Sequence, residues 1–497
     1  MTTTRASLLL LALLTALPAP AQDRAAAAGL TLTTLTLPGV RAPVAELVCP
    51  VVRPARKPAP RPPAAPAPET RIPEEDEVRE ALTEERAAAS AGAASAAAAA
   101  GPAPSGWPRP SARQPMRLAV WGDSHMAAGF FTEELLRLLG QGDVLAQPRL
   151  VPAAFGHPGV RGLVRRACVS QEWTREPAHA VAEAARQPGP GLVSLVAARP
   201  GATLALDLRD ASGSPRHHAV QLLVAPLAQG STIGLTVDGE PERLLRLAPQ
   251  EGASALELVA PDAPLSVLRL RVVDGPLRLQ GLRIGAGGDA STPAAPAAPT
   301  APAMALEVDL YGYPGATAAG WARAEPSVLG GWFAQRPYDL VMLAYGTNEA
   351  HDARFQPEAY RELLVRAVAG VRRQFPQARC VLVAPGDRGV RVSGRARPAP
   401  ASKKGRAAAA RPARPSAAEL LRYARRHEQV AAIQQEVAAQ AGCASWSMQA
   451  AMGGAGSAYP WARATPPLMA GDLLHFTAAG YRELARRFAA DFGWGTP

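Results

Sequence analysis

The sequence predicts an α/β protein with a doubly wound parallel sheet, an inserted antiparallel β-sandwich and a disordered N-terminal region. Three observations lead to this prediction. Short apolar runs alternate with segments of helical periodicity over 116–143 and 306–492, which is typical of a parallel sheet covered by helices. Between them, residues 192–284 contain runs of alternating apolar and polar residues separated by turn signals, as in an antiparallel sandwich. Residues 22–113 are rich in Ala, Pro and charge and cannot bury enough apolar surface to offset their ordering entropy.

The elements follow from these periodicities in chain order. In the α/β part we expect strands at 116–122, 306–310, 338–345 and 380–384, and helices at 130–139, 360–375, 417–441 and from about 477 to 492. In the sandwich we expect strands at 203–207, 219–224, 233–237 and 267–272. The stretch 151–175 is rich in loop signals and has no clear period.

The same patterns divide the chain into successive parts. These are a signal peptide at 1–21, a Pro/Ala-rich disordered linker at 22–113, the first part of the α/β domain at 114–185, the inserted β-sandwich at 186–287, a linker at 288–303, and the second part of the α/β domain at 304–497, in which 388–416 is a basic low-complexity loop.

The N-terminal segment indicates export. Arg5 precedes an apolar run from Leu8 to Leu17, and the small residues Ala19-Pro20-Ala21 follow, as in a secretory signal. The run is too short to span a bilayer comfortably. We therefore expect an exported protein in the periplasm or outside the cell, with an uncleaved anchor as the alternative.

Charge and cysteines limit the partners and the redox compartment. The formal net charge of +11 comes largely from Arg53–Arg61 and Arg388–Arg414, where solvated charge on a low-complexity segment is the simplest explanation. No aromatic residues are interleaved with these charges, so nucleic acid is not an expected partner, while peripheral contact with acidic envelope polymers stays open. Of the four cysteines, Cys380 and Cys443 begin consecutive predicted strands and are the first choice for a disulfide, with buried free thiols as the alternative.

Ser124 is the candidate nucleophile. It follows the apolar run that ends at Gly122 and so lies at the carboxyl end of a predicted strand, where ligands bind in open α/β sheets. A serine hydroxyl needs a base, and the base needs a third group to orient it. Asp472 and His475, three apart before the last helix, can supply both from one loop, although such a pair is more often a surface turn or a helix cap.

Three donors are candidates for stabilising an oxyanion: the backbone N–H groups of Ser124 and Gly315 and the side-chain amide of Asn348. His125 and His351 flank the predicted catalytic turns and are candidate substrate contacts, with packing or solvent exposure as the alternative. The other histidines lack the spacing of metal ligands. We expect neither a metal nor a cofactor.

Four short motifs together resemble the SGNH (GDSL-type) hydrolases: Gly122-Asp123-Ser124, the Gly315 turn, Gly346-x-Asn348 and Asp472-x-x-His475, in that order. The resemblance implies an SGNH or flavodoxin-like sheet, with Ser124 as nucleophile, His475 as general base, Asp472 as its orienting group, and Ser124, Gly315 and Asn348 as oxyanion donors. His125 stands where the GDSL name has leucine. This variant, with Gly346-Thr347-Asn348-Glu349-Ala350 and Met452-Gly453-Gly454, is similar to the branch that contains bacterial peptidoglycan O-acetylesterases, whose members also carry a carbohydrate-binding-like β-module between the first two motifs.

The sequence and the resemblance together favour an exported serine esterase that removes a small acyl group, expected to be acetyl, from an acylated polysaccharide or peptidoglycan. A glycan O-acyltransferase with the same triad is one alternative. A non-catalytic glycan-binding envelope protein on a hydrolase scaffold is another.

Overall fold

The computed structural model describes residues 30–37, 39, 44–50, 70–91, 107–110, 116–139, 150–162, 164–180, 188–285, 306–324, 326–333, 337–393 and 415–494. The predicted signal peptide and the predicted linker at 288–303 lie outside these residues, as does most of the predicted basic loop. No helix among the described residues has the length and apolar character needed to cross a membrane.

A five-stranded parallel sheet forms the centre of the α/β part. Its strands, in spatial order, are β15 (Leu306–Gly312), β3 (Met116–Gly122), β16 (Leu340–Ala344), β17 (Arg379–Ala384) and β19 (Ala444–Ser447). All four pairings are parallel. In chain order, β3 is the first strand of this parallel sheet, and the later strands are added on both sides of it. This is the doubly wound topology that the sequence predicted.

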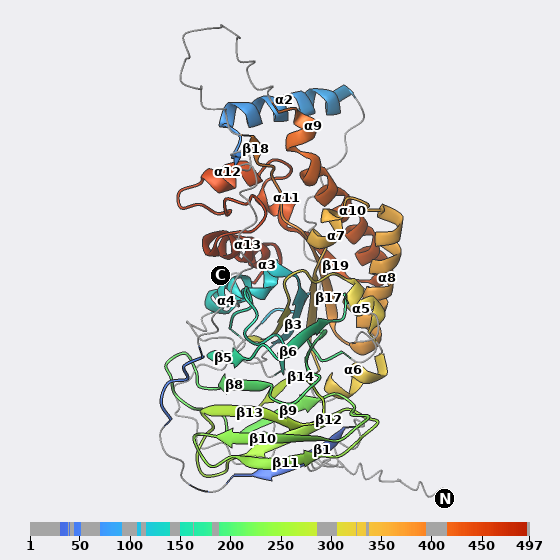
Figure 1. Ribbon diagram of the computed structural model, residues 1–497. Helices are drawn as coiled ribbons and strands as arrows, with labels where there is room; N and C mark the ends of the chain where they lie inside the picture. Colours follow the sequence, from blue (N-terminus) through green and yellow to red (C-terminus); the bar gives the residue numbers. More distant parts are fainter. Residues whose placement is uncertain are drawn as a thin grey trace, which may run out of the picture.

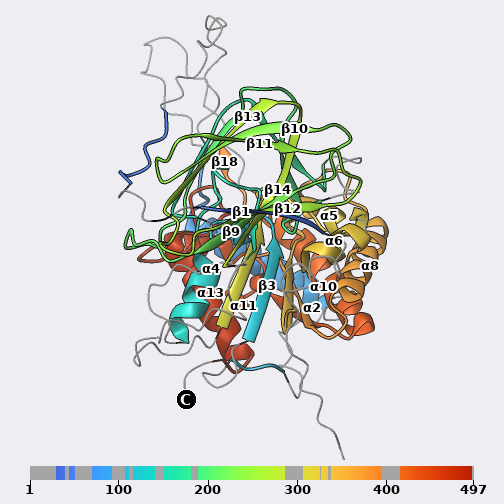
Figure 2. The same ribbon diagram turned by 90° about the horizontal axis from the view of Figure 1, so that it is seen from below.

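Helices cover both faces of this sheet. The helices of the α/β part are α3 (Ser124–Ala127), α4 (Phe130–Leu138), α5 (Ala319–Arg323), α6 (Pro326–Phe333), α7 (Thr347–His351), α8 (Pro357–Gln374), α9 (Ala417–Leu420), α10 (Arg422–Ala441), α11 (Met448–Met452), α12 (Ala458–Arg463) and α13 (Ala478–Asp491). Figure 2 shows α4 and α13 on one side of β3 and α8 and α10 on the other.

The side chains of the central strand explain this layering. Leu118 and Val120 belong to the core on the α4 and α13 side, whereas Ala119 and Trp121 belong to the core on the opposite side. Alternate residues of a strand point to opposite faces, so a strand that is apolar at every position needs helices on both.

Two antiparallel sheets form the second part of the molecule (Figure 1). One contains β1 (Thr31–Thr36), β12 (Ser254–Val259), β9 (Ala219–Val224), β14 (Leu277–Ile284), β7 (Val193–Ala197), β6 (Trp173–Pro177) and β4 (Leu150–Pro152), with β1 joined in parallel. The other contains β11 (Arg243–Leu247), β10 (Ser231–Val237), β13 (Val267–Asp274), β8 (Thr203–Asp207) and β5 (Arg166–Val169). The predicted α/β class with an inserted antiparallel module is confirmed.

The structure differs from the predicted boundaries in two places. Strands β4, β5 and β6 precede residue 186, the predicted start of the sandwich, yet they belong to the antiparallel sheets. Strand β1 and helix α2 (Glu75–Ala91) lie within the predicted linker 22–113, and β2 (Thr70–Arg71) pairs with β18 (Val392–Ser393). These strands are short or lie at the edge of a sheet, so their periodicity extends over too few residues to be recognised. Pairing with strands that are distant in the sequence holds them in place.

Two disulfides connect distant segments. Cys380 at the start of β17 bonds Cys443, which directly precedes β19, so the pairing favoured from sequence is confirmed. Cys49 bonds Cys168 of β5. The second bond attaches residues 44–50 to the antiparallel sheet and shows why the predicted linker contains an ordered segment.

Candidate active site

Ser124 is positioned by the tight turn that follows β3. The Asp123 side chain caps the short helix α3 by accepting a hydrogen bond from the backbone N–H of His125 at 2.9 Å. A Cβ at Gly122 would lie 2.6 Å from Met126 Cγ and 3.0 Å from the Ala344 carbonyl oxygen, so only glycine allows this close approach. Ser124 therefore starts a helix at the carboxyl edge of the parallel sheet.

The structure brings the three predicted triad residues into one hydrogen-bonded chain. The Ser124 hydroxyl oxygen lies 3.0 Å from His475 Nε2. His475 Nδ1 lies 2.8 Å from Asp472 Oδ2. These distances are within the range for proton transfer between a hydroxyl and an imidazole and for orientation of the imidazole by a carboxylate.

The loop before α13 holds the aspartate and the histidine together. Asp472 Oδ1 accepts hydrogen bonds from the backbone N–H groups of Leu474 and His475, both at 3.0 Å. The other carboxylate oxygen is left for the imidazole. The three-residue spacing read from the sequence therefore corresponds to a turn in which one carboxylate fixes both the backbone and the ring.

The charges of the pair are coupled. The hydrogen bond to Asp472 raises the pKa of His475 above its ordinary value, although burial opposes this. Burial also acts to raise the pKa of Asp472, but hydrogen bonds from the His475 ring and from the backbone outweigh it and hold that pKa below its usual range. Asp472 is therefore an anion at neutral pH and favours the imidazolium form of His475.

The three predicted oxyanion donors lie in turns that follow adjacent strands at the carboxyl edge of the parallel sheet. Gly122 of β3 is paired with Gly312 of β15 on one side and with Ala344 of β16 on the other. The turns after these three strands carry Ser124, Gly315 and Asn348, so they start side by side. Gly315 has a φ of +81°, a conformation that favours glycine.

Asn348 connects two of these turns. Its Nδ2 donates a hydrogen bond to the Ala316 carbonyl oxygen at 2.8 Å. The amide carries a second N–H, which makes no hydrogen bond to the described residues. The side chain can thus hold the Gly315 turn in place with one hydrogen and offer the other to a ligand.

Glu349 has a positioning role that was not predicted from the sequence. Its Oε1 accepts a hydrogen bond from the backbone N–H of Ala318 at 2.9 Å, and its Oε2 accepts one from that of Gly346 at 3.1 Å. Burial of the carboxylate raises the pKa of Glu349 to about 7. The side chain ties the loop that carries Gly315 to the turn that carries Asn348. A glutamate directly after Asn348 in a turn is a signal that could have indicated this.

The Glu349→Gln protein is expected to have a kcat for ester hydrolysis about tenfold lower than the wild-type protein, with a smaller change in KM. Glutamine has one acceptor oxygen, so its NH₂ group must face one of two backbone donors, which costs about 1–3 kcal/mol per unpaired buried group and displaces the Gly315 loop. Steady-state kinetics on p-nitrophenyl acetate measures this. Glu362→Gln, on an exposed position of α8, is the control, and an unchanged kcat in Glu349→Gln would contradict the role.

The two histidines proposed as substrate contacts have different surroundings. His125 is buried, and its Nδ1 lies 3.2 Å from the Tyr481 hydroxyl. Burial, followed by the charge of His475, lowers the pKa of His125 to about 3, so it is neutral at physiological pH. His351 is exposed at the end of α7, and its Nδ1 accepts a hydrogen bond from Arg388 Nη1 at 2.7 Å. No local pattern in the sequence indicated a role for Arg388 at this site.

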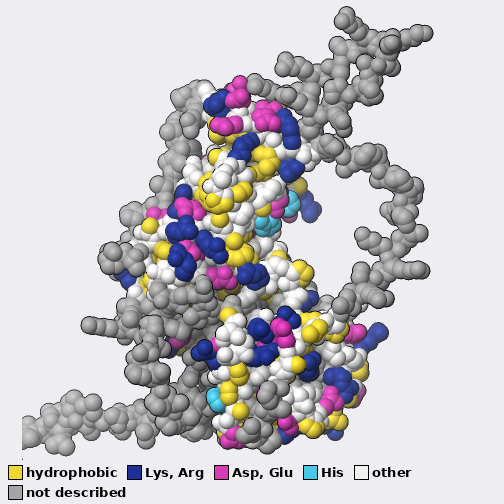
Figure 3. Space-filling view, turned by 90° about the vertical axis from the view of Figure 1, so that its left-hand side faces the viewer, with side chains coloured by type: hydrophobic (Ala, Val, Ile, Leu, Met, Phe, Trp, Pro, Cys, Tyr) yellow, Lys and Arg dark blue, Asp and Glu magenta, His cyan; other side chains and the backbone are white. Residues whose placement is uncertain are grey.

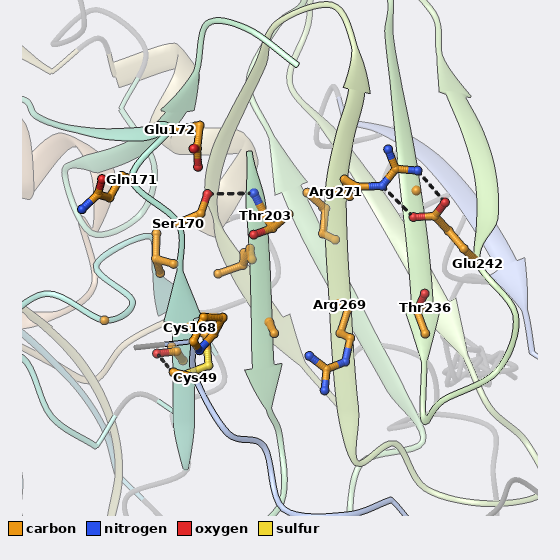
Figure 4. Close-up of a pocket in the computed structure, with 18 residues that line it drawn as sticks. Cys49, Cys168, Ser170, Gln171, Glu172, Thr203, Thr236, Glu242, Arg269 and Arg271 are labelled. Carbon is orange, nitrogen blue, oxygen red and sulfur yellow. Dashed lines mark hydrogen bonds and ion pairs between the residues drawn. A yellow bond between two sulfur atoms is a disulfide. The ribbon is translucent and has the colours of Figure 1, made fainter. Parts of the chain in front are cut away.

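A separate cavity lies on the outer face of the β11-β10-β13-β8-β5 sheet. It has a volume of about 680 Å³, and Thr236, Glu242, Arg269 and Arg271 are among its lining residues (Figure 4). None of the predicted site residues lines it. Among the described residues, no group of three or more His, Cys, Asp or Glu side chains is placed to hold a metal ion.

The fold and the site define a class of proteins. A parallel α/β sheet whose carboxyl edge presents a serine, an imidazole and a carboxylate in one hydrogen-bonded chain is typical of hydrolases that act on acyl groups.

A protein-family model matches the second part of the chain. Residues 280–483 match the GDSL-like Lipase/Acylhydrolase family, so the chain contains a GDSL-like acylhydrolase domain and is an esterase. The matched range includes Gly315, Asn348, Asp472 and His475, whereas Ser124 precedes it. No curated protein matches the sequence.

One solved structure supports the fold, and two others show a weaker likeness. A peptidoglycan O-acetylesterase is 21% identical, with a TM-score of 0.51, and the alignment covers 77% of this chain and 92% of that one. A carbohydrate esterase family 2 enzyme with a carbohydrate-binding domain, from Corynascus thermopiles (Myceliophthora fergusii), is 14% identical over 60% of this chain and 96% of that one, with a TM-score of 0.24. A family two carbohydrate esterase from Cellvibrio japonicus is 12% identical over 66% and 98%, with a TM-score of 0.24.

Proposed function

We propose that this protein is an exported serine esterase that removes a small acyl group, acetyl, from an O-acylated cell-envelope glycan. The observation that carries the proposal is the continuous hydrogen-bonded chain from Ser124 through His475 to Asp472, together with the GDSL-like acylhydrolase domain. The likeness of the fold to a peptidoglycan O-acetylesterase makes O-acetylated peptidoglycan the first substrate to test.

In this proposal the reaction has two halves. The Ser124 oxygen attacks the ester carbonyl carbon while His475 Nε2 takes the hydroxyl proton, and the resulting oxyanion accepts hydrogen bonds from Ser124 N, Gly315 N and Asn348 Nδ2. The C–O bond to the sugar then breaks, and His475 returns the proton to the sugar oxygen. Water, deprotonated by His475, attacks the acyl-serine, and the carboxylic acid leaves as Ser124 regains its proton.

An oxidising location fits the covalent structure. Both pairs of cysteines form disulfides, which persist in the periplasm and outside the cell but are rare in the cytosol of mesophiles. This supports the export that the N-terminal sequence predicts.

The test measures hydrolysis of three substrates by the purified protein: acetate release from O-acetylated peptidoglycan and from acetylated xylan, and p-nitrophenol release from a long-chain p-nitrophenyl ester. We expect the fastest turnover on a glycan acetyl ester and little on the long-chain ester. Fast hydrolysis of the long-chain ester would make the protein a lipase instead. Acetylation of an added glycan acceptor would identify a transferase, and binding to the glycan without release of acetate from any ester would identify a non-catalytic glycan-binding protein.

A further inference from the structure

The segment that follows β17 packs directly against the loop of the proposed base. The backbone N–H of Gly389 donates to the Leu473 carbonyl oxygen at 3.0 Å, and Arg391 Nη1 donates to the Gly471 carbonyl oxygen at 2.7 Å. Arg388 lies in this segment, and its charge acts on both Asp472 and His475. The segment that carries Arg388 is therefore in contact with the loop that carries Asp472 and His475.

The guanidinium of Arg388 is held in place by two neighbours but uses only part of its hydrogen-bonding capacity. Its Nη1 donates to His351, and its guanidinium carbon lies 3.9 Å from the centroid of the Tyr423 ring. Within the described part of the chain it makes no ion pair with a carboxylate and no other hydrogen bond. A guanidinium has five N–H donors, so this stacked and half-buried group can still offer a forked pair of donors to an acceptor.

Two more arginines, Arg422 and Arg426, lie with Tyr423 on helix α10. The guanidinium carbon of Arg422 is 4.7 Å from the centroid of Tyr423. Arg426 Nη1 donates to the carbonyl oxygens of Ala350 and Asp352, at 3.3 and 3.1 Å. Like Arg388, neither forms an ion pair with a described carboxylate. Figure 3 shows histidine side chains beside Lys or Arg and hydrophobic side chains in the middle of one face of the molecule.

None of these three arginines forms an ion pair with a carboxylate among the described residues. Both Arg422 and Arg426 act against the charge of Arg388. Asp472, whose charge acts on Arg388, is already bonded to His475. Asp387, directly before Arg388, accepts hydrogen bonds from Gln449 and Ala458. Residues 394–414, which follow the Arg388 segment, contain arginines and lysines but no aspartate or glutamate. Like charges held together without a counter-charge are unfavourable, and an anionic ligand would relieve this.

We propose that Arg388, stacked on Tyr423 and supported by Arg422, forms a subsite for a carboxylate that the glycan substrate carries near its acyl ester. This inference rests on the proposed esterase function and gives it a substrate class: anionic rather than neutral acylated glycans. The carboxylate can belong to the sugar or to an attached peptide, because a guanidinium binds both in the same forked geometry.

The test compares kcat/KM for an anionic and a neutral acetyl ester in the wild-type protein and its variants. The anionic substrates are O-acetylated muropeptides and the same fragments after an amidase has removed the peptide; the neutral one is an acetylated xylo-oligosaccharide. The ratio of anionic to neutral kcat/KM is the readout, because an effect on His475 changes both values equally. We expect Arg388→Gln to lower this ratio about tenfold and Arg388→Lys to lower it less.

Arg199→Gln is the matched control. Arg199 lies between β7 and β8 in the antiparallel part of the molecule, is exposed, and makes no hydrogen bond or ion pair with the described residues. Its replacement removes the same net charge and is expected to leave the ratio unchanged. Raising the salt concentration to about 0.5 M should lower the ratio in the wild-type protein and have little effect in Arg388→Gln, because screening weakens only an interaction that exists.

The outcomes separate the two proposals. A wild-type protein that releases acetate, but whose ratio is the same after Arg388→Gln, would overturn the subsite and keep the esterase. A wild-type protein that releases no acetate would overturn the esterase. The subsite would then be decided by binding of deacetylated muropeptides to Ser124→Ala, which Arg388→Gln should weaken about tenfold. The amidase frees a carboxylate on the sugar that is an amide in the peptide-bearing fragment. Loss with the peptide-bearing fragment alone would therefore assign the carboxylate to the peptide, loss with the amidase-treated fragment alone would assign it to the sugar, and loss with both would show that the subsite accepts either.

Discussion

The Ser124→Ala protein should hydrolyse p-nitrophenyl acetate at least about 10⁴ times more slowly than the wild-type protein. The hydroxyl oxygen of Ser124 is 3.0 Å from His475 Nε2, and in the proposed mechanism it is the atom that bonds the acyl carbon. Without this oxygen the oxyanion donors and the imidazole stay in place, but no acyl-enzyme can form. The KM should change little, because alanine fills almost the same space.

Two measurements make this result specific to Ser124. Ser445→Ala alters a half-buried serine in β19 of the same sheet and should keep wild-type activity. A fluorophosphonate probe should label the wild-type protein at Ser124 and leave Ser124→Ala unlabelled, as judged by mass spectrometry. Activity of Ser124→Ala within tenfold of wild type would disprove the nucleophile.

The Asp472→Asn protein should lose about 10⁴-fold in kcat. In the wild-type protein the carboxylate accepts a hydrogen bond from His475 Nδ1 at 2.8 Å, which leaves Nε2 unprotonated and facing Ser124. An asparagine amide can instead donate to Nδ1, and the ring then carries its proton on Nε2, where it cannot act as a base. Asp339→Asn, distant from this loop in the sequence and directly before β16, is the control.

The pH dependence provides an independent check of the same pair. His475 acts as a base when it is neutral, and Asp472 raises its pKa above the ordinary value. The acidic limb of kcat/KM for the wild-type protein should therefore have its midpoint above about pH 6.5. In Asp472→Asn the imidazolium loses its neighbouring anion, so the midpoint of the residual activity should move to lower pH. A midpoint that stays in place would show that another group titrates.

Much of the fold could be predicted from local patterns. The apolar run around Val120 and the helical stripe of Leu484 and Phe488 lie in the predicted strand and helix, because a strand buried on both faces and an amphipathic helix have distinct periods. Strand β1 could not be predicted in the same way. It is an edge strand whose place depends on pairing with β12, more than two hundred residues away, and its own sequence does not specify that partner.

Local patterns likewise indicated some residues of the site and not others. Local chemistry indicated the serine after Gly122 and the Asp-x-x-His turn, since a helix cap and a short turn are formed by neighbouring residues. Arg388 was assigned from sequence to a basic low-complexity loop that includes residues now found packed against the His475 loop. The low-complexity composition of the residues after this segment led to its assignment as part of the loop. The contacts that hold the segment in place come from a loop about eighty residues further along the chain.

The sequence by itself determined which residue types are available for acyl chemistry and at which strand ends they occur, because these depend on short-range periodicity and turn geometry. Only the tertiary structure decided that Ser124 and His475, 351 positions apart, lie within hydrogen-bond distance, and that Arg388 lies beside them without a counter-charge. Such distances are set by how strands pair and helices pack across the whole sheet, and no single segment contains that information.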